Sequence, residues 1–335
     1  MSNHRGQRAS ASAGRLRWPA LALALLLLFN LITSPSFFHV EIKQGHLYGS
    51  LIDVPKEAAP MLLTALGMTL VIATAGIDLS VGAVMAIAGA IAALLITTTP
   101  AGLLLTLVAA TGFCLAAGLW NGVLVAWFGV QPIVATLVLM VAGRGVAQLL
   151  TEGQIITFNH AGLAFIGGGY LLGLPLPVLM VVAMAALAAL LTRRTALGLF
   201  IESVGNNETA SYCAGVNVRR VKLLVYAYSG LCAGVAGLIE AADIKAADAN
   251  NCGLYVELDA ILAVVIGGTA LTGGRFFLVG TILGALIIQT LTTSIYTQGV
   301  PVEFTLVAKA LVVLAVCLLQ SEALRHVLLR RKGMA

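Results

Sequence analysis

The stretch MLLTALGMTLVIATAGIDLSVGAVMAIAGAIAALLIT, residues 61–97, carries a single charged side chain, that of Asp78. Two apolar runs, at residues 57–75 and 78–97, flank the sequence GIDLSVG at residues 76–82. A helix rises about 1.5 Å per residue, so each run is long enough to cross a hydrocarbon core of about 30 Å. The stretch therefore predicts two transmembrane helices joined by a turn that has glycine at both ends.

The composition of the whole chain extends this interpretation. Of the 335 residues 60% are hydrophobic and only 10% are charged, whereas about 25% are charged in soluble proteins. The apolar residues suffice for about ten spans of about 20 residues each, and the 36 glycines allow helices to pack closely. We expect an all-α fold, a polytopic membrane helical bundle of about ten transmembrane helices in one domain over residues 1–335.

The apolar segments can be placed along the sequence. The first follows a basic stretch but lacks the small-residue cleavage pattern of a signal peptide, and Pro35 follows it, so we expect it to remain as a span. The ten predicted spans are residues 18–33, 57–75, 78–97, 102–128, 132–150, 174–191, 223–242, 257–271, 276–296 and 304–319.

The distribution of Lys and Arg predicts the orientation, because cytoplasmic loops carry the excess of both. Basic residues gather at residues 1–17, 193–222 and 321–335, whereas residues 151–173 contain no Lys or Arg. Six spans separate the first two basic regions and four separate the last two, so all three can lie on one side. We expect an inner-membrane protein with both termini and the 193–222 loop in the cytoplasm, and with Asn159 outside.

Two glycine-rich connections between apolar segments look related, GIDLSVG at residues 76–82 and GGTALTGGR at residues 267–275. They suggest a weak internal repeat. Either turn could also enter the membrane as a broken helix, because irregular backbone is allowed there where protein or a water-filled cavity satisfies it.

Several classes of function find little support in the sequence. The net charge of +5 comes from basic residues at the ends of apolar segments, so a nucleic-acid partner is not expected. No P-loop, HExxH or nucleophile-elbow pattern is present, so we expect no enzyme activity, catalytic residue or cofactor. The cysteines have no metal-ligand spacing, and we expect neither a metal site nor a disulfide framework; they are Cys114, Cys213, Cys232, Cys252 and Cys317.

The polar loop RRTALGLFIESVGNNETASYCAGVNVRRVK, residues 193–222, is long and amphipathic. Glu208 and Gly215 would stand at the two ends of a short helix, where an acid and a glycine are favoured. The loop is therefore either a solvated connection between two spans or a surface on which a partner docks.

Four ordered motifs resemble the permease subunits of bacterial ABC sugar importers of the ribose/galactose class, and the resemblance runs from about residue 18 to residue 320. They are GIDLSVG at 76–82, Glu208-Thr209-Ala210 with Gly215, YSGLCAGVAGLIEAADI at 228–244 and ELDAILAVVIGGTALTGG at 257–274. Within that class, residues 134–150 and 246–268 look most like permeases of the galactofuranose type.

This resemblance implies a set of partners. The coupling helix, with Glu208, Thr209, Ala210 and Gly215, would dock on a separate cytoplasmic ATP-binding subunit; Thr209 stands where the family usually has alanine. A periplasmic sugar-binding protein would deliver a monosaccharide, and a second permease subunit would complete the pore, with a heterodimer favoured over a homodimer.

Two groups inside the predicted spans are candidates for the translocation path. Arg144 lies about 18 Å along its span, where a charge needs a partner. It would bind sugar hydroxyls or extend to the outer surface. Trp120 and Asn121 offer an aromatic ring beside an amide, as sugar sites do, although a buried Asn more often bonds a neighbouring helix.

Acidic and amide side chains near predicted span ends complete the candidate sites. Asp78 and Asp259 either cap helices or line the path, with Ser80 as a further cap. Asp248, Asn250 and Asn251 lie in a loop predicted to be outside, where a delivering protein would land.

Two rival functions were weighed. An ion-coupled secondary sugar transporter would need acidic residues near the middle of the membrane, and the acidic residues here lie near predicted span ends. A scaffold or channel would not need the docking loop.

Overall fold

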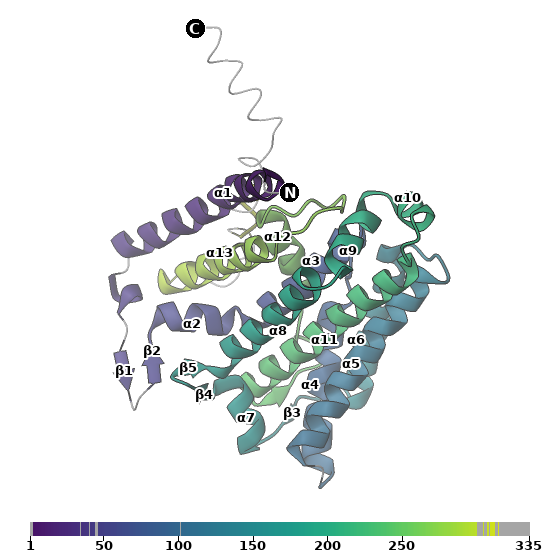
Figure 1. Cartoon of the computed structure of the whole chain (residues 1–335). Helices are drawn as coiled ribbons and strands as arrows, with labels where there is room; N and C mark the ends of the chain where they lie inside the picture. The colour runs from purple at the N-terminus through teal and green to yellow at the C-terminus, as the bar shows by residue number, and fades with distance from the viewer. Residues whose placement is uncertain are drawn as a thin grey trace.

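The computed structural model describes residues 3–299 except 34, 40, 44, 45 and 101, and the isolated residues 304, 307, 309–311 and 314. Within this part the chain is mainly helical (Figure 1). The helices are α1 (Asn3–Thr33), α2 (Ser50–Glu57), α3 (Ala59–Ala73), α4 (Val81–Thr98), α5 (Leu103–Ala126), α6 (Pro132–Leu150), α7 (Ala161–Gly168), α8 (Leu176–Arg193), α9 (Leu197–Asn206), α10 (Glu208–Cys213), α11 (Val218–Ile244), α12 (Val256–Ile266) and α13 (Leu278–Thr297), with a 3-10 turn η1 (Pro35–Phe38).

Three short antiparallel strand pairs lie at the end of the bundle opposite to α10 (Figure 1). They are β1 (Glu41–Lys43) with β2 (His46–Tyr48), β3 (Ile156–Thr157) with β6 (Ala246–Ala247), and β4 (Tyr170–Leu171) with β5 (Leu174–Pro175). The β3–β6 pair joins the loop after α6 to the loop after α11.

Helix α11 forms the centre of the bundle and packs against α3, α4 and α5. Glycines allow the closest contacts: a Cβ at Gly230 would lie 2.4 Å from the carbonyl oxygen of Cys114 on α5. By contrast, α5, α6 and α8 expose large apolar side chains such as Trp120, Val141 and Leu190. Such an outer surface suits a lipid environment or another membrane subunit.

Six of the described helices are long and apolar enough to cross a membrane, namely α4, α5, α6, α8, α11 and α13. Helices α2 and α3, bent by 47°, together make a seventh candidate. The apolar part of α1 is shorter, and most of the predicted span 304–319 and all of the tail 321–335 lie outside the described residues. The polytopic helical architecture is thus present, with fewer full spans in the described part than the predicted ten.

The predicted span at residues 257–271 differs most from the structure. It is the half-length helix α12, of 11 residues, which is about 16 Å long. The helix ends at Ile266 because Gly267 packs against the backbone of Gly280 and Gly268 adopts a φ of +87°.

Two connections run inside the bundle. In the α3–α4 junction, residues 74–82, the chain turns back after α3, and Asp78 reaches Ser229, about 16 Å from the first residue of α11. In the α11–α12 junction, residues 245–257, the chain folds back from the other end until Gly253 meets Gly82. A Cβ at Gly82 would lie 2.2 Å from the Gly253 oxygen, so the first turns of α4 and α12 lie close together.

The turn at residues 267–275 occupies a different place. The Gly274 N–H donates to the Ala73 oxygen at 2.9 Å, which puts this turn beside the end of α3. The turn also meets the start of the α3–α4 junction, because a Cβ at Gly273 would lie 2.7 Å from the Ala75 nitrogen.

Candidate functional site

Asp78 is the centre of the α3–α4 junction and is 1% exposed. Its Oδ1 accepts hydrogen bonds from the Ser80 N–H at 3.1 Å and from the Ser80 hydroxyl at 2.6 Å. Its Oδ2 accepts one from the Ser229 hydroxyl of α11 at 2.7 Å. The interpretation of Asp78 and Ser80 as helix caps is wrong, because the Ser80 side chain makes no cap bond to α4 and binds Asp78 instead.

Asn121 joins this network from α5, whereas Trp120 points away from it. The fully buried Asn121 donates through Nδ2 to the Ser80 oxygen at 3.0 Å. Trp120 is 57% exposed on the outer side of the bundle. The two neighbours therefore do not form one site, and the amide binds a neighbouring element.

Arg144 reaches the α11–α12 junction from α6. Its Nη1 donates to the carbonyl oxygens of Ala249 at 3.0 Å and Cys252 at 2.6 Å. Glu240 of α11 accepts from the Gly253 N–H at 3.2 Å. Arg144 thus has the protein partner that its cost in a membrane predicts, and that partner is backbone.

The outer part of the same junction holds the three residues predicted to receive a delivering protein. Asp248 accepts from the N–H groups of Asn250 and Asn251 and from the Asn251 amide at 2.7 Å. These hydrogen bonds, led by that of the Asn251 side chain, lower the pKa of Asp248. Gln148 of α6 donates to the Asn250 side chain at 2.7 Å, so an ordered turn presents exposed Asn250 and Asn251.

A cavity of about 300 Å³ lies among α2, α3, α7, α11, α12 and α13. Of the predicted site residues only Asp259 lines it. Five further polar side chains lining the cavity were missed: Lys56, Glu57, Glu240, Asp243 and Gln289. The spacing of Glu240 and Asp243, which puts them on one face of a helix, was the available signal.

Polar contacts connect the elements around this cavity. Lys56 of α2 pairs with Asp243 of α11 at 2.9 Å, and Gln289 of α13 donates to Glu57 at 3.0 Å. Asp259 lies in the first turn of α12, where an acid favours the helix dipole, and pairs with Lys309 at 3.3 Å.

The expectation that acidic residues lie at span ends is wrong for Asp78 and Glu257. Asp78 is buried against the middle of α11. A Cβ at Gly82 would lie 2.7 Å from the Glu257 carboxylate, which is therefore also inside the bundle. The prediction placed each apolar run in one straight helix. In the structure, turns inside the bundle bring these two residues into its interior.

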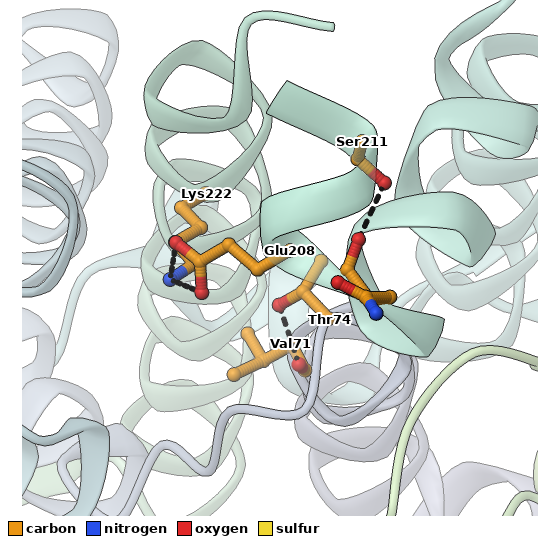
Figure 2. Close-up of polar contacts among 6 residues, drawn as sticks. Val71, Thr74, Glu208, Ser211 and Lys222 are labelled. Atoms are coloured by element: carbon orange, nitrogen blue, oxygen red, sulfur yellow. Dashed lines mark hydrogen bonds and ion pairs between the residues drawn. The ribbon is translucent and has the colours of Figure 1, made fainter. Parts of the chain in front are cut away.

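The 193–222 loop folds into α9 and α10, and the predicted short helix is confirmed. The Asn207 side chain caps α10 by accepting from the Ala210 N–H at 2.9 Å, and Gly215 follows the helix with a φ of +85°. Thr209 is exposed. Glu208 forms an ion pair with Lys222 of α11 at 2.7 Å (Figure 2). The sequence did not predict this pair, because Lys222 lies 14 residues after Glu208.

Helix α9 brings the 193–222 loop into contact with the end of α3 and with the turn at residues 267–275. A Cβ at Gly205 would lie 1.9 Å from the Ala73 oxygen, and Asn206 donates to the Gly274 oxygen at 3.4 Å. Thr74, the first residue of the α3–α4 junction, donates its hydroxyl to the Val71 oxygen at 2.8 Å (Figure 2). The loop thus rests directly on the start of the α3–α4 junction.

Apolar outer helices, polar interior junctions and a folded polar loop at one end are typical of a polytopic membrane protein. The family described as "Branched-chain amino acid transport system / permease component" matches residues 51–317. The chain belongs to this family and is a multi-pass inner-membrane transport subunit.

Known relatives cover nearly the whole chain. The galactofuranose transporter permease protein YtfT of Escherichia coli is 56% identical over 92% of both chains. The fructose import permease protein FruF of Bifidobacterium longum is 40% identical over 94% of this chain and 90% of its own. The ribose import permease protein RbsC of Haemophilus influenzae is 37% identical over 89% and 90%. No solved structure matches the chain.

Proposed function

We propose that the chain is the permease subunit of an ATP-driven ABC importer for a monosaccharide, galactofuranose or a related sugar. The observation that carries the proposal is the 56% identity over 92% of both chains to a permease named for galactofuranose. Relatives named for fructose and ribose support the wider class of substrate. The chain would form part of the translocation path, and a separate subunit would hydrolyse ATP.

The proposed coupling surface is the exposed part of α9 and α10, including Glu208, Thr209, Ala210 and Gly215. An ATP-binding subunit that moves this surface would also move the end of α3, because Gly205 packs on Ala73. The α3–α4 junction begins one residue later. The contacts therefore supply a short mechanical route from the docking surface to the polar interior.

The other partners are proposed on the opposite end and along the sides. A periplasmic sugar-binding protein would contact the turn at Asp248, Asn250 and Asn251. A second permease chain, different from this one, would complete the pore. Arg144, Asn121, Asp78 and Asp259 remain candidates for the path, and Trp120 could join it only where the path follows the outer face of α5.

The proposed topology has ten spans with both termini and α10 in the cytoplasm. The half-length α12 counts as one crossing together with its junction, and the segment at 304–319 would be the tenth. Asn159 belongs to the loop that contains β3, at the end of the bundle opposite to α10 (Figure 1). Impermeant labelling of Asn159→Cys in intact cells, with the exposed Cys213 replaced by serine, tests this orientation. Labelling that requires access from the cytoplasm would reject it.

Reconstitution tests the function itself. The chain, a second permease, the ATP-binding subunit and the binding protein are placed in vesicles, and labelled galactofuranose is supplied outside. Uptake should require ATP inside the vesicles and should not respond to proton or sodium gradients. Uptake driven by a gradient without the ATP-binding subunit would instead establish the ion-coupled alternative.

Charge reversal tests the docking surface. Glu208→Lys should reduce co-purification of the ATP-binding subunit without reducing membrane insertion, because it opposes the α10 dipole and any basic groove of the partner. The double variant Glu208→Lys with Lys222→Glu restores the internal ion pair and serves as the control. Full recovery of assembly in the double variant would show that Glu208 acts only within the loop.

A further inference from the structure

The cavity between α2 and the α11–α12 region has the size and chemistry of a small-molecule site. Its volume of about 300 Å³ is at the lower end of the range of about 300–1,000 Å³ for ligand sites. Met61, Ile239 and Val256 supply apolar walls beside the polar side chains. A sugar ring needs this combination, because its C–H faces are apolar and its rim carries hydroxyls.

We propose that this cavity binds the transported monosaccharide within a single permease chain, through hydrogen bonds from the sugar hydroxyls to its carboxylates. This inference rests on the proposed function and names a substrate site for it. The acceptors are Glu57, Glu240, Asp243 and Asp259, and the donors on the lining are Lys56 and Gln289.

The balance of donors and acceptors selects the class of ligand. A carboxylate can accept about four hydrogen bonds, and each of these four has one partner described above. The lining therefore favours a neutral ligand with several donors, and it disfavours sugar phosphates and sugar acids. A metal ion fits less well, because the Lys56 ammonium is 2.9 Å from Asp243. No group of metal-ligating side chains occurs among the described residues.

The position of the cavity connects it to the moving parts of the bundle. Glu240 lines the cavity and also holds the Gly253 N–H of the α11–α12 junction. Lys56 and Glu57 reach across from α2, which is bent by 47° from α3. A bound sugar would compete for these contacts. Its binding would weaken the attachment of α2 and the hydrogen bond from Gly253 of the α11–α12 junction to Glu240.

Protection of an introduced cysteine tests occupancy. Ile244→Cys, at a residue that also lines the cavity, is made in the complete importer with Cys213 replaced by serine, and its reaction with a small methanethiosulfonate reagent is timed. Galactofuranose should slow the reaction at least threefold, and inositol phosphate should not. The matched control is Gln154→Cys in an exposed loop, whose reaction should not change.

The outcomes separate this inference from the function on which it rests. Import of the sugar by the Ile244→Cys complex with no protection would overturn the cavity site and leave the proposed function intact. Protection by sodium or calcium chloride and not by sugar would show a cation site and also overturn it. Absence of ATP-dependent import in the unmodified complex would reject the proposed function.

A second variant guards against a folding defect. Gln289→Leu keeps the side-chain volume and removes the amide, so it should weaken protection of a cysteine placed at Ile244 about three- to tenfold. The Gln154→Leu variant should leave that protection unchanged. Equal protection in both variants would contradict the role of the amide.

Discussion

The two junctions hold irregular backbone inside the bundle by opposite means. The α3–α4 junction carries its own acceptor, the Asp78 carboxyl group, which binds two hydroxyls and an N–H in a fully buried network. The α11–α12 junction offers carbonyl oxygens instead, and the cation of Arg144 holds them from another helix. Buried backbone groups need hydrogen-bond partners in either case. We call the α3–α4 junction sealed, because its polar network is fully buried, and the α11–α12 junction open, because it borders the cavity.

We infer from this difference that the two junctions have different roles in the permease. The sealed junction lies against the 193–222 loop, whereas the open junction borders the cavity and contains the exposed turn at Asn250 and Asn251. Gly82 and Gly253 join them by direct backbone contact. We therefore expect movement that starts at either end of the bundle to reach the other junction through this pair of glycines.

The largest effect is expected where the sealed network loses its carboxyl group. Asp78→Ala leaves two buried hydroxyls and one N–H without their acceptor, and each costs about 1–3 kcal/mol. The purified variant should show a large loss of thermal stability in detergent, measured as the Tm by dye binding. Glu152→Gln, on an exposed loop, is the control. Wild-type stability of Asp78→Ala would mean that the network contributes little.

The glycine contact comes next. In Gly82→Ala the new Cβ would lie 2.2 Å from the Gly253 oxygen, so the first turns of α4 and α12 must separate, at a cost of about 1–3 kcal/mol. Gly112→Ala on α5, where a Cβ meets no atom within 4 Å, should be neutral or stabilising. Equal Tm values for the two variants would show that the contact between Gly82 and Gly253 accommodates a methyl group at little cost.

The sequence predicted much of the helical framework and little of the junctions. Apolar runs up to Tyr296 each contain a helix, because burial in lipid demands continuous hydrophobicity. Asp78 was interpreted as a local cap, and nothing local shows that Ser229, 151 positions later, holds its carboxylate. Arg144 was predicted to need a partner from its cost alone, and only the folded chain identifies the carbonyls.

The open junction should be less sensitive in stability and more sensitive in transport. Arg144→Leu removes a half-buried charge, so expression should stay near normal. The carbonyls of Ala249 and Cys252 lose their hydrogen bonds to Arg144, and the junction is no longer held to α6 by them. ATP-dependent uptake should fall severely. Arg144→Lys should restore part of it, because a point charge replaces the planar fork, and Arg144→Gln should restore less. Full uptake by Arg144→Leu would remove Arg144 from both the path and the junction.

The smallest effect is expected at the exposed turn that leads into the open junction. Hydrogen bonds from Asn250 and Asn251 lower the pKa of Asp248, so its contribution to stability is complete above its ordinary pKa of 3.8. That contribution is lost as the pH falls through the lower value in the folded protein. Because the carboxylate is largely exposed, solvent screening keeps the effect small. Hydrogen exchange of residues 249–252, corrected for intrinsic rates, should therefore be constant from pH 7 to pH 5 and increase in acid. The Asp248→Asn variant should exchange faster at neutral pH and show no further acid-dependent increase. An equal acid response in both proteins would place the titrating group elsewhere, and the turn would then be held by Arg144 and Gln148 alone.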